Sequence, residues 1–223
     1  MVDWKKAQTA LGCVADGMPG PTTYTALYAH AAGRQADAAI AARAAMAAKH
    51  FADFGMTTAP RIAEFIAQTC NETGGFRFFE EKLGYRAATL RKLWPKRFTA
   101  EQAEAAVGNP VEIASRAYGG RMGNAPHPST EGHTYRGRGD LQLTGKENYT
   151  RFGKLLELDL VGNPDLAAGE IGTLIALQFF KLGNVNAAVD AGDFTRARKI
   201  INGGTIGLEE VARIRERLLK VLG

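Results

Sequence analysis

The chain has 223 residues, of which 45% are hydrophobic, so it is long and apolar enough for one sizeable packed domain, with or without a small appendage. Lys and Arg total 28 against 23 Asp and Glu, which gives a formal net charge of +5. The basic residues are dispersed, with no run of five or more, so the charge suits an anionic polymer as a partner and equally suits ordinary solubility.

The chain lacks the marks of an exported, membrane or disulfide-rich protein. Residues 1–6 contain no apolar segment of signal-peptide length, so we expect synthesis in the cytoplasm without a standard export signal. The Ala-rich stretch 38–48 is interrupted by Arg43 and is too short to span a bilayer. Cys13 and Cys70 lack a metal-ligand spacing and imply no disulfide framework, although the sequence leaves open whether they pair.

Residues 1–33 form a separate pattern. Apolar residues recur at helical spacing before and after the turn-rich stretch 12–21, at Trp4, Ala7, Ala10 and Leu11 and again at Tyr24, Leu27 and Tyr28. The spacing Leu-Gly, Ala-Asp-Gly, Gly-Pro-x-Thr and Ala-Leu resembles about half of the peptidoglycan-binding repeat found at the ends of many wall hydrolases. We therefore expect 1–35 to be a small helical, peptidoglycan-binding-like segment. A helical hairpin that only caps the main domain is the alternative.

A helix that ends at a carboxylate is the most informative element of the chain. Apolar side chains at intervals of three and four predict a helix that starts near Thr58 and Pro60 and buries Cys70 on its apolar face. Gly74-Gly75 stops this helix directly after Glu72. An acidic side chain in a last turn faces the negative end of the helix dipole, which is unfavourable unless a partner or a task keeps it there.

The remaining elements are also mainly helical. Thr99-Ala-Glu-Gln102 is a capping-box pattern that opens a helix through Ala106, and helices are predicted over 166–182 and 208–222. The Gly- and Pro-bearing stretch 119–139 predicts a long loop. Only residues 140–144 alternate as in a strand, which cannot support a sheet-based fold.

Three separated segments carry the chemistry: Asn71-Glu-Thr-Gly-Gly-Phe76, Tyr135-Arg-Gly-Arg-Gly-Asp-Leu-Gln-Leu-Thr-Gly-Lys-Glu-Asn-Tyr149 and Ile200-Ile-Asn-Gly-Gly204. Together they resemble the family 19 glycoside hydrolases, in particular the phage endolysins that are similar in fold to plant chitinases. The resemblance covers about 40–222. It implies a mainly α, two-lobed, lysozyme- or chitinase-like helical domain with a central cleft, which we assign to residues 36–223.

Two carboxylates match the catalytic pair of the family. Glu72 corresponds to the general acid, which protonates the glycosidic oxygen, and Glu81 to the general base, which activates water in an inverting mechanism. The Gly-Gly break lets the two face each other across a cleft, whereas nine residues of one straight helix would place them on opposite faces. Glu80 is the rival for the base.

The resemblance also implies the residues that line the cleft. Thr144 corresponds to a residue that helps to hold the attacking water. The expected substrate-binding residues are Gln142, Asn148, Tyr149, Asn202, Arg213 and Tyr135. Arg215 and Arg217 compete with Arg213 for contact with the cleft carboxylates, and Arg136 and Arg138 could bridge the lobes by pairing with carboxylates. If Leu141 and Leu143 point inward, Gln142 and Thr144 share the opposite face of a strand.

Two positions depart from the endolysin pattern. Asn71 stands where a histidine usually precedes the acid, and an amide can form hydrogen bonds but cannot titrate. Asp140 stands where an apolar residue is usual. We expect its carboxylate to face solvent, although near the cleft it could act on a neighbouring acid. The histidines, including His127 and His133, fit no metal site, so we expect no metal and no cofactor.

The expected function is that of an endolysin: hydrolysis of the β-1,4 glycan backbone of peptidoglycan at the muramic acid linkage, for lysis of a bacterial host. We expect a monomer that binds peptidoglycan glycan strands, without nucleic-acid partner or membrane insertion. It would leave the host cytoplasm through a membrane opened by a holin. A chitinase, a lytic transglycosylase that needs no base at Glu81, and a non-catalytic wall-binding protein are the alternatives. A nucleic-acid binder would show an aromatic and basic groove pattern that this sequence lacks.

Overall fold

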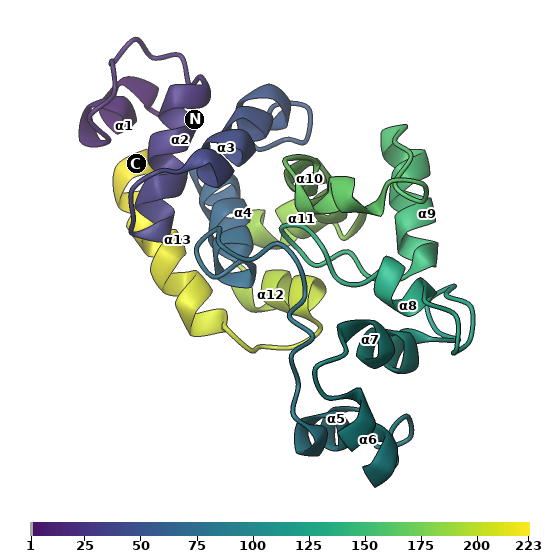
Figure 1. Ribbon diagram of the computed structural model, residues 1–223. Helices are drawn as coiled ribbons and strands as arrows, with labels where there is room; N and C mark the ends of the chain where they lie inside the picture. The colour runs from purple at the N-terminus through teal and green to yellow at the C-terminus, as the bar shows by residue number, and fades with distance from the viewer. Residues whose placement is uncertain (1) are drawn as a thin grey trace. The chain divides into compact units, whose positions relative to one another are not determined.

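The computed structural model describes residues 2–223, which divide into two compact units. Unit 1 contains the described residues up to Phe79, Gly139–Leu141 and Ala168–Gly223, and unit 2 contains Glu80–Arg138 and Gln142–Ala167. Both units are helical (Figure 1), and the described residues pair in β fashion only at isolated bridges. The prediction of a mainly α fold is confirmed. Among residues 2–223, no helix combines the length and the apolar run needed to cross a bilayer.

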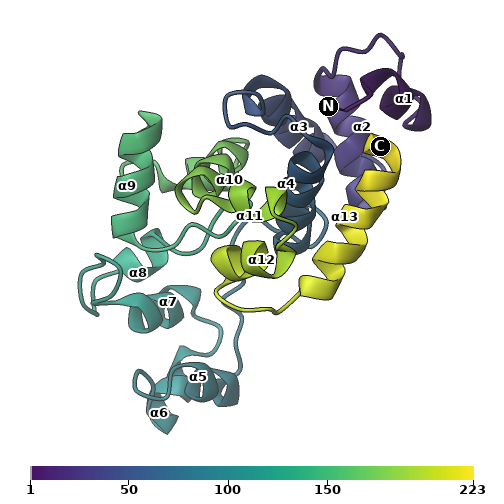
Figure 2. The same ribbon diagram turned by 180° about the vertical axis from the view of Figure 1, so that it is seen from behind.

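Unit 1 is built from the N-terminal and the C-terminal helices of the chain. Its helices are α1 (Trp4–Ala10), α2 (Pro21–Ala32), α3 (Ala38–His50), α4 (Ala59–Glu72), α10 (Ile171–Leu182), α11 (Val185–Asp190), α12 (Phe194–Asn202) and α13 (Leu208–Leu222). Helix α4 packs against α13, α2 and α11, and Figures 1 and 2 both show α13 running beside α4. Nearly every residue of α4 from Ala59 to Cys70 is buried, which makes α4 the central helix of unit 1.

The core of unit 1 is strongly aromatic. Phe65 of α4 lies between Phe51 and Phe180, with ring centroids 5.3 and 4.9 Å away, and Phe51 in turn contacts Tyr24 at 5.1 Å. These rings meet edge to face, the arrangement that their quadrupoles favour. Aromatic packing thus ties α4 to residues before and after it in the sequence.

The N-terminal segment shares this core. Its two predicted helices are present as α1 and α2, separated by the expected turn-rich stretch. Trp4 packs on Tyr24, with ring centroids 5.6 Å apart, and Leu27 and Tyr28 are fully buried in the same cluster as α4 and α13. Helices α1 and α2 therefore pack onto the core of unit 1. Glycan binding by residues 1–35 stays a prediction.

Unit 2 has a smaller core. Its helices are α5 (Ala87–Leu93), α6 (Ala100–Ala106), α7 (Pro110–Tyr118), α8 (Glu131–Thr134), α9 (Lys146–Leu156) and the 3₁₀ helix η1 (Pro164–Ala168), whose last residue lies in unit 1. The predicted capping box opens α6, with Thr99 and Gln102 each bonding to the other's backbone N–H. The predicted loop 119–139 contains only the short α8. The helix predicted over 166–182 is instead η1 followed by α10, because residues around Gly169 interrupt it.

The segment 140–144 differs most from its prediction. Gln142 has φ of +54°, in the left-handed region, so the backbone turns there and the predicted strand does not form. Asp140 is completely buried, so the prediction that it faces solvent is wrong. Its partner is Arg43 of α3, which the sequence marked only as an interruption of the Ala-rich stretch.

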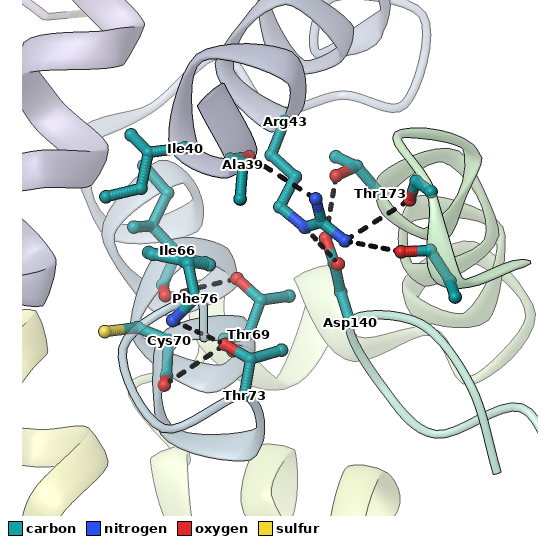
Figure 3. Close-up of polar contacts among 12 residues, drawn as sticks. Ala39, Ile40, Arg43, Ile66, Thr69, Cys70, Thr73, Phe76, Asp140 and Thr173 are labelled. Carbon is teal, nitrogen blue, oxygen red and sulfur yellow. Dashed lines mark hydrogen bonds and ion pairs between the residues drawn. The ribbon is translucent and has the colours of Figure 1, made fainter. Parts of the chain in front are cut away.

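Arg43 and Asp140 form a buried ion pair (Figure 3). Nε of Arg43 donates to Oδ1 of Asp140 at 2.8 Å, and the hydroxyl of Thr173 donates to Oδ2 at 2.7 Å. The guanidinium also bonds to the carbonyl of Ala168 at 2.9 Å and lies 3.2 Å from the centroid of the Phe79 ring. Burial raises the pKa of Asp140, and Arg43 opposes that rise by stabilising the charged carboxylate. The pair fixes Gly139–Leu141 against α3 and α10.

Removing one partner of this pair should be costly. We predict that Asp140→Asn lowers the free energy of unfolding by about 3–5 kcal/mol, because it leaves the Arg43 charge buried and unpaired. Urea denaturation at pH 7 measures the change. Asp53→Asn is the matched control, because the side chain of Asp53 is 73% exposed, and it should change stability by less than about 0.5 kcal/mol. Equal effects of the two variants would contradict the structural role of Asp140.

Candidate active site

Glu72 lies at the end of α4, as the sequence predicts. The hydroxyl of Thr58 caps the start of the helix, and Gly74 and Gly75, with φ of +58° and +77°, end it. Thr73 stabilises the turn that follows: its hydroxyl donates to the Thr69 carbonyl at 2.6 Å and accepts from the N–H of Phe76 at 3.0 Å (Figure 3). Since positive φ favours glycine, the two glycines set where the helix stops. Their position leaves Glu72 in the last turn.

A polar ladder runs along one face of α4 to Glu72. We use this name for Glu64, Gln68 and Glu72, which are four residues apart and so share a face, and the arginines that join them. Arg215 of α13 donates to Oε2 of Glu64 at 2.9 Å, and Nε2 of Gln68 donates to Oε1 of Glu64 at 2.7 Å. Arg198 of α12 then donates to Oε1 of Gln68 at 2.7 Å and contacts Oε1 of Glu72 at 2.6 Å. The ladder is continuous from the buried Glu64 to Glu72.

Arg198 makes the contact between Gln68 and Glu72 at the end of the ladder. Its side chain is 1% exposed, and its Nε donates to the carbonyl of Ile206 at 2.7 Å. Gly207 packs closely against the guanidinium of Arg198. A Cβ at Gly207 would lie 3.0 Å from Nη2 of Arg198, and the φ of +78° also favours glycine. The side chain of Glu72 is 20% exposed. Glu72 therefore presents a partly exposed carboxyl group beside a buried guanidinium.

The sequence did not identify Arg198. We expected Arg213, Arg215 or Arg217 to reach the carboxylates, but Arg213 pairs with Glu210 on the surface and Arg215 pairs with the buried Glu64. The available signal was Asn202, since Arg198 lies four residues before it on the same face of α12. Asn202 itself is exposed at the C-terminal end of α12, with Gly203 directly after it.

Asn71 lies beside Glu72. Its Nδ2 donates to Oε1 of Glu72 at 3.3 Å, a long hydrogen bond to the same oxygen that Arg198 contacts. The amide thus supplies a donor to the carboxyl group without being able to take up a proton itself.

In unit 2, adjacent carboxylates have different environments. Glu80 forms an ion pair with Arg136, and its side chain is 43% exposed. Glu81 instead accepts a hydrogen bond of 2.6 Å from the hydroxyl of Tyr118. Burial, with the Glu81 carboxylate, raises the pKa of Tyr118 well above its usual range, so the hydroxyl keeps its proton and remains a donor. Glu81 is thus the carboxylate held by a neutral donor, and Tyr118 is a second site residue that the sequence did not reveal.

Gly137 brings three expected site residues together in unit 2. Its carbonyl accepts from the N–H of Glu81 at 2.9 Å. A Cβ on Gly137 would lie 2.5 Å from Oε1 of Gln142 and 3.2 Å from Oγ1 of Thr144, so only glycine leaves room for both side chains. Asn148 supports this arrangement, since its Nδ2 donates to the carbonyl of Thr144 at 2.8 Å. Glu81, Gln142 and Thr144 therefore surround the same backbone position.

The tyrosines of this segment have structural roles. Tyr149 is fully buried and donates to the carbonyl of Arg136 at 2.9 Å, while Tyr135 is 6% exposed and its hydroxyl donates to the carbonyl of Val161 at 3.3 Å. Their rings pack 5.3 Å apart. Both side chains are covered and their hydroxyls are already engaged in these bonds, and their contact with substrate stays a prediction.

The arginines of the segment pair within unit 2. Arg136 pairs with Glu80, and the buried Arg138 contacts Asp165 at 2.7 Å and donates to the carbonyl of Thr134 at 2.7 Å. The expectation that they bridge the lobes is therefore replaced by pairing with carboxylates of their own unit. Across residues 2–223, no three His, Cys, Asp or Glu side chains gather as they would around a metal ion.

Comparison with known proteins adds independent information. Residues 28–184 match the sequence model of glycoside hydrolase family 19, described as class I chitinase. A Haemophilus influenzae protein with a family 19 glycosyl hydrolase domain is 34% identical over 163 residues, which are 70% of this chain and 78% of that protein. An endochitinase of Arabidopsis thaliana is 36% identical over 94 residues, which are 41% of this chain and 32% of the plant protein. The match thus spans about a third of the plant enzyme.

A solved structure has the same fold. The crystal structure of a bacterial family 19 chitinase superposes with a TM-score of 0.56 and 22% sequence identity, covering 89% of this chain and 94% of that chain.

The polar ladder predicts the effect of a charge-conserving change. Arg198→Lys should lower the free energy of unfolding by about 1–3 kcal/mol, because an ammonium on a flexible stem cannot keep the bonds to Gln68, Ile206 and Glu72 at once. Arg213→Lys is the matched control, since Arg213 is exposed and pairs on the surface, and it should change stability by less than about 0.5 kcal/mol. Urea denaturation of both variants measures these changes in the free energy of unfolding. A fully stable Arg198→Lys protein would show that the ladder does not depend on the guanidinium.

Proposed function

The chain belongs to glycoside hydrolase family 19, and we propose that it is the endolysin type of this family, an enzyme that hydrolyses the glycan backbone of bacterial peptidoglycan. Membership makes it a chitinase-like hydrolase of β-1,4-linked glycans. The assignment of peptidoglycan as the substrate is our proposal. Within that polymer we assign the cut to the linkage after muramic acid.

The observation that carries the catalytic part of this proposal is the setting of Glu72. Its carboxyl group is partly exposed at the end of a buried helix, and Arg198 and Asn71 both contact its Oε1. A general acid must reach the glycosidic oxygen and must be stable as a carboxylate after it gives up its proton. The partial exposure of Glu72 supports the first of these, and the guanidinium of Arg198 supports the second.

We assign the general base to Glu81. The hydroxyl of Tyr118 orients its carboxylate, while Thr144 and Gln142 lie against the Gly137 backbone to which Glu81 is bonded. In this proposal Glu81 removes a proton from water, Thr144 helps to hold that water, and the water attacks the anomeric carbon as Glu72 protonates the leaving oxygen. Attack from the opposite side of the sugar inverts the anomeric configuration.

The N-terminal segment supports peptidoglycan as the substrate. Its resemblance to the peptidoglycan-binding repeat is accompanied by an ordered loop, in which Nε2 of Gln8 donates to Asp16 at 2.8 Å and Oε1 accepts from the N–H of Gly17 at 2.8 Å. The loop also exposes Val14 and Met18, at 82% and 70%. Exposed apolar side chains on a fixed loop suit contact with a ligand. Residues 1–35 would then hold the enzyme on the wall.

Action on the wall implies a route to it. We propose that the enzyme acts as a monomer on peptidoglycan strands in the periplasm after a holin opens the inner membrane of the host.

Hydrolysis of chitin is the second candidate. It is favoured by the similarity to an endochitinase and to a solved bacterial chitinase. Both polymers have a β-1,4-linked N-acetylhexosamine backbone, so the same pair of carboxylates could serve either one.

Conservative replacements test the catalytic assignment. Glu72→Gln and Glu81→Gln should each reduce the rate of peptidoglycan solubilisation by about 10²–10⁴-fold, since each removes one proton-transfer group while keeping its shape. The measurement is the loss of turbidity of purified walls, with circular dichroism to confirm folding. Glu80→Gln is the matched control, because the adjacent Glu80 is engaged by Arg136, and it should retain most activity.

Other outcomes would change the assigned acid, the type of reaction or the substrate. An active Glu72→Gln enzyme would sink the assignment of the acid. An active Glu81→Gln enzyme beside an inactive Glu72→Gln enzyme would indicate a lytic transglycosylase, which needs no water-activating base. Wild-type enzyme that cleaves chitin oligomers and leaves walls intact would establish the second candidate.

A further inference from the structure

A hollow of about 500 Å³ opens in unit 1 beside Asn71, the residue that precedes the candidate acid. It is lined by the ends of α2 and α4, the turn after α4, and α13, including Asn71, Gly33 and three arginines, Arg77, Arg213 and Arg217. Asn71 is the residue whose amide donates to Glu72 at 3.3 Å. Glu72 itself does not line the hollow, so Asn71 is the residue that connects the hollow with the carboxyl that we assign as the acid.

The arginines of the hollow are poorly matched by negative charge. Glu210 is the carboxylate among the lining residues, and Arg213 already engages it at 2.6 and 3.0 Å. Arg217 donates to the carbonyl of Ala31, but its Nε is buried without an acceptor. The side chain of Arg77 is exposed and forms no hydrogen bond or ion pair with any residue that the structure describes. The hollow thus carries two positive charges in excess.

Glycines keep these guanidinium groups uncovered. Gly33 ends α2 with φ of +63°, and a Cβ there would lie 3.3 Å from Nη1 of Arg217. Gly75 has φ of +77°, and a Cβ there would lie 3.7 Å from Nη1 of Arg77. Arg34 fixes the turn by donating to the carbonyls of Gly75 and Phe76, both at 3.0 Å. The floor of the hollow is therefore ordered backbone, next to donors that have room for a ligand.

We propose that this hollow binds carboxylates of the lactyl-peptide substituent that peptidoglycan carries on muramic acid. Guanidinium groups pair with carboxylates through two parallel hydrogen bonds, and the gain is largest where they lack other partners. Chitin carries no anionic group and would leave Arg77 and Arg217 unmatched. The inference rests on the proposed function and deepens it, because it names the chemical group by which this site would distinguish peptidoglycan from chitin.

The experiment varies the charge of both the enzyme and the substrate. The full-length enzyme is assayed on purified peptidoglycan and on the same material after its carboxyl groups have been converted to amides with carbodiimide and ammonia. Wild-type kcat/KM should fall about tenfold on the amidated walls, the effect of losing a charge-assisted pair. Arg77→Gln should fall by a similar factor on native walls and match the wild type on amidated walls.

Arg196→Gln is the matched control. It makes the same change of charge in unit 1, on an exposed residue two positions from Arg198 and so on a different face of α12. It should equal the wild type on both substrates. Arg77→Glu, which repels carboxylates, should lose more activity than Arg77→Gln on native walls only. Because the side chains of Arg77 and Arg196 are exposed, all of these variants should fold, as circular dichroism will verify.

Failure of the hollow and failure of the proposed function give different results. A wild type that cleaves native and amidated walls at the same rate, or an Arg77→Gln variant that is impaired equally on both or on neither, would overturn the hollow while leaving the hydrolase assignment intact. A wild type that cleaves no glycosidic bond in either material would overturn the proposed function, and the inference with it.

Discussion

A single guanidinium group, that of Arg198, is the contact on which the candidate site in unit 1 depends. It joins α12 to α4 through Gln68 and Glu72 and to the segment before α13 through the carbonyl of Ile206. Charge buried this completely is costly unless each donor has a partner, and here Gln68 and Glu72 share that role. The same contacts hold the carboxyl of Glu72 where α4 ends. The packing of unit 1 and the position of the proposed acid are therefore coupled through one side chain.

The two carboxylates that we assign to catalysis differ from their neighbours in exposure or in what they contact. Glu80 and Glu81 are adjacent in the sequence, but their carboxylates have different partners. One carboxylate is taken up by Arg136, while the other is held by the neutral hydroxyl of Tyr118. A neutral donor orients a carboxylate without competing for its charge, as a base requires. Glu64 and Glu72 of α4 both contact an arginine and differ instead in exposure, because Glu64 is fully buried in its pair with Arg215 whereas the side chain of Glu72 is 20% exposed.

Local signals predicted much of the fold, and long-range pairing explains what they missed. The end of α4 followed from Gly74-Gly75, the capping box of α6 from Thr99 and Gln102, and the last helix from its apolar spacing, because each depends on residues within one turn. Arg198 contacts Gln68 across 130 residues and Arg43 contacts Asp140 across 97, so no local pattern could reveal either pair. The burial of Tyr135 and Tyr149 likewise depends on the core of unit 2.

The most direct test of the account is the chemical identity of the products. Soluble fragments released from purified peptidoglycan are reduced with borohydride and analysed by mass spectrometry, beside a chitin oligomer. Hydrolysis by this enzyme predicts fragments that end in reduced muramic acid. Anhydromuramic ends would contradict hydrolysis, reduced glucosamine ends would move the cut to the other linkage, and release of products from chitin alone would contradict peptidoglycan as the substrate.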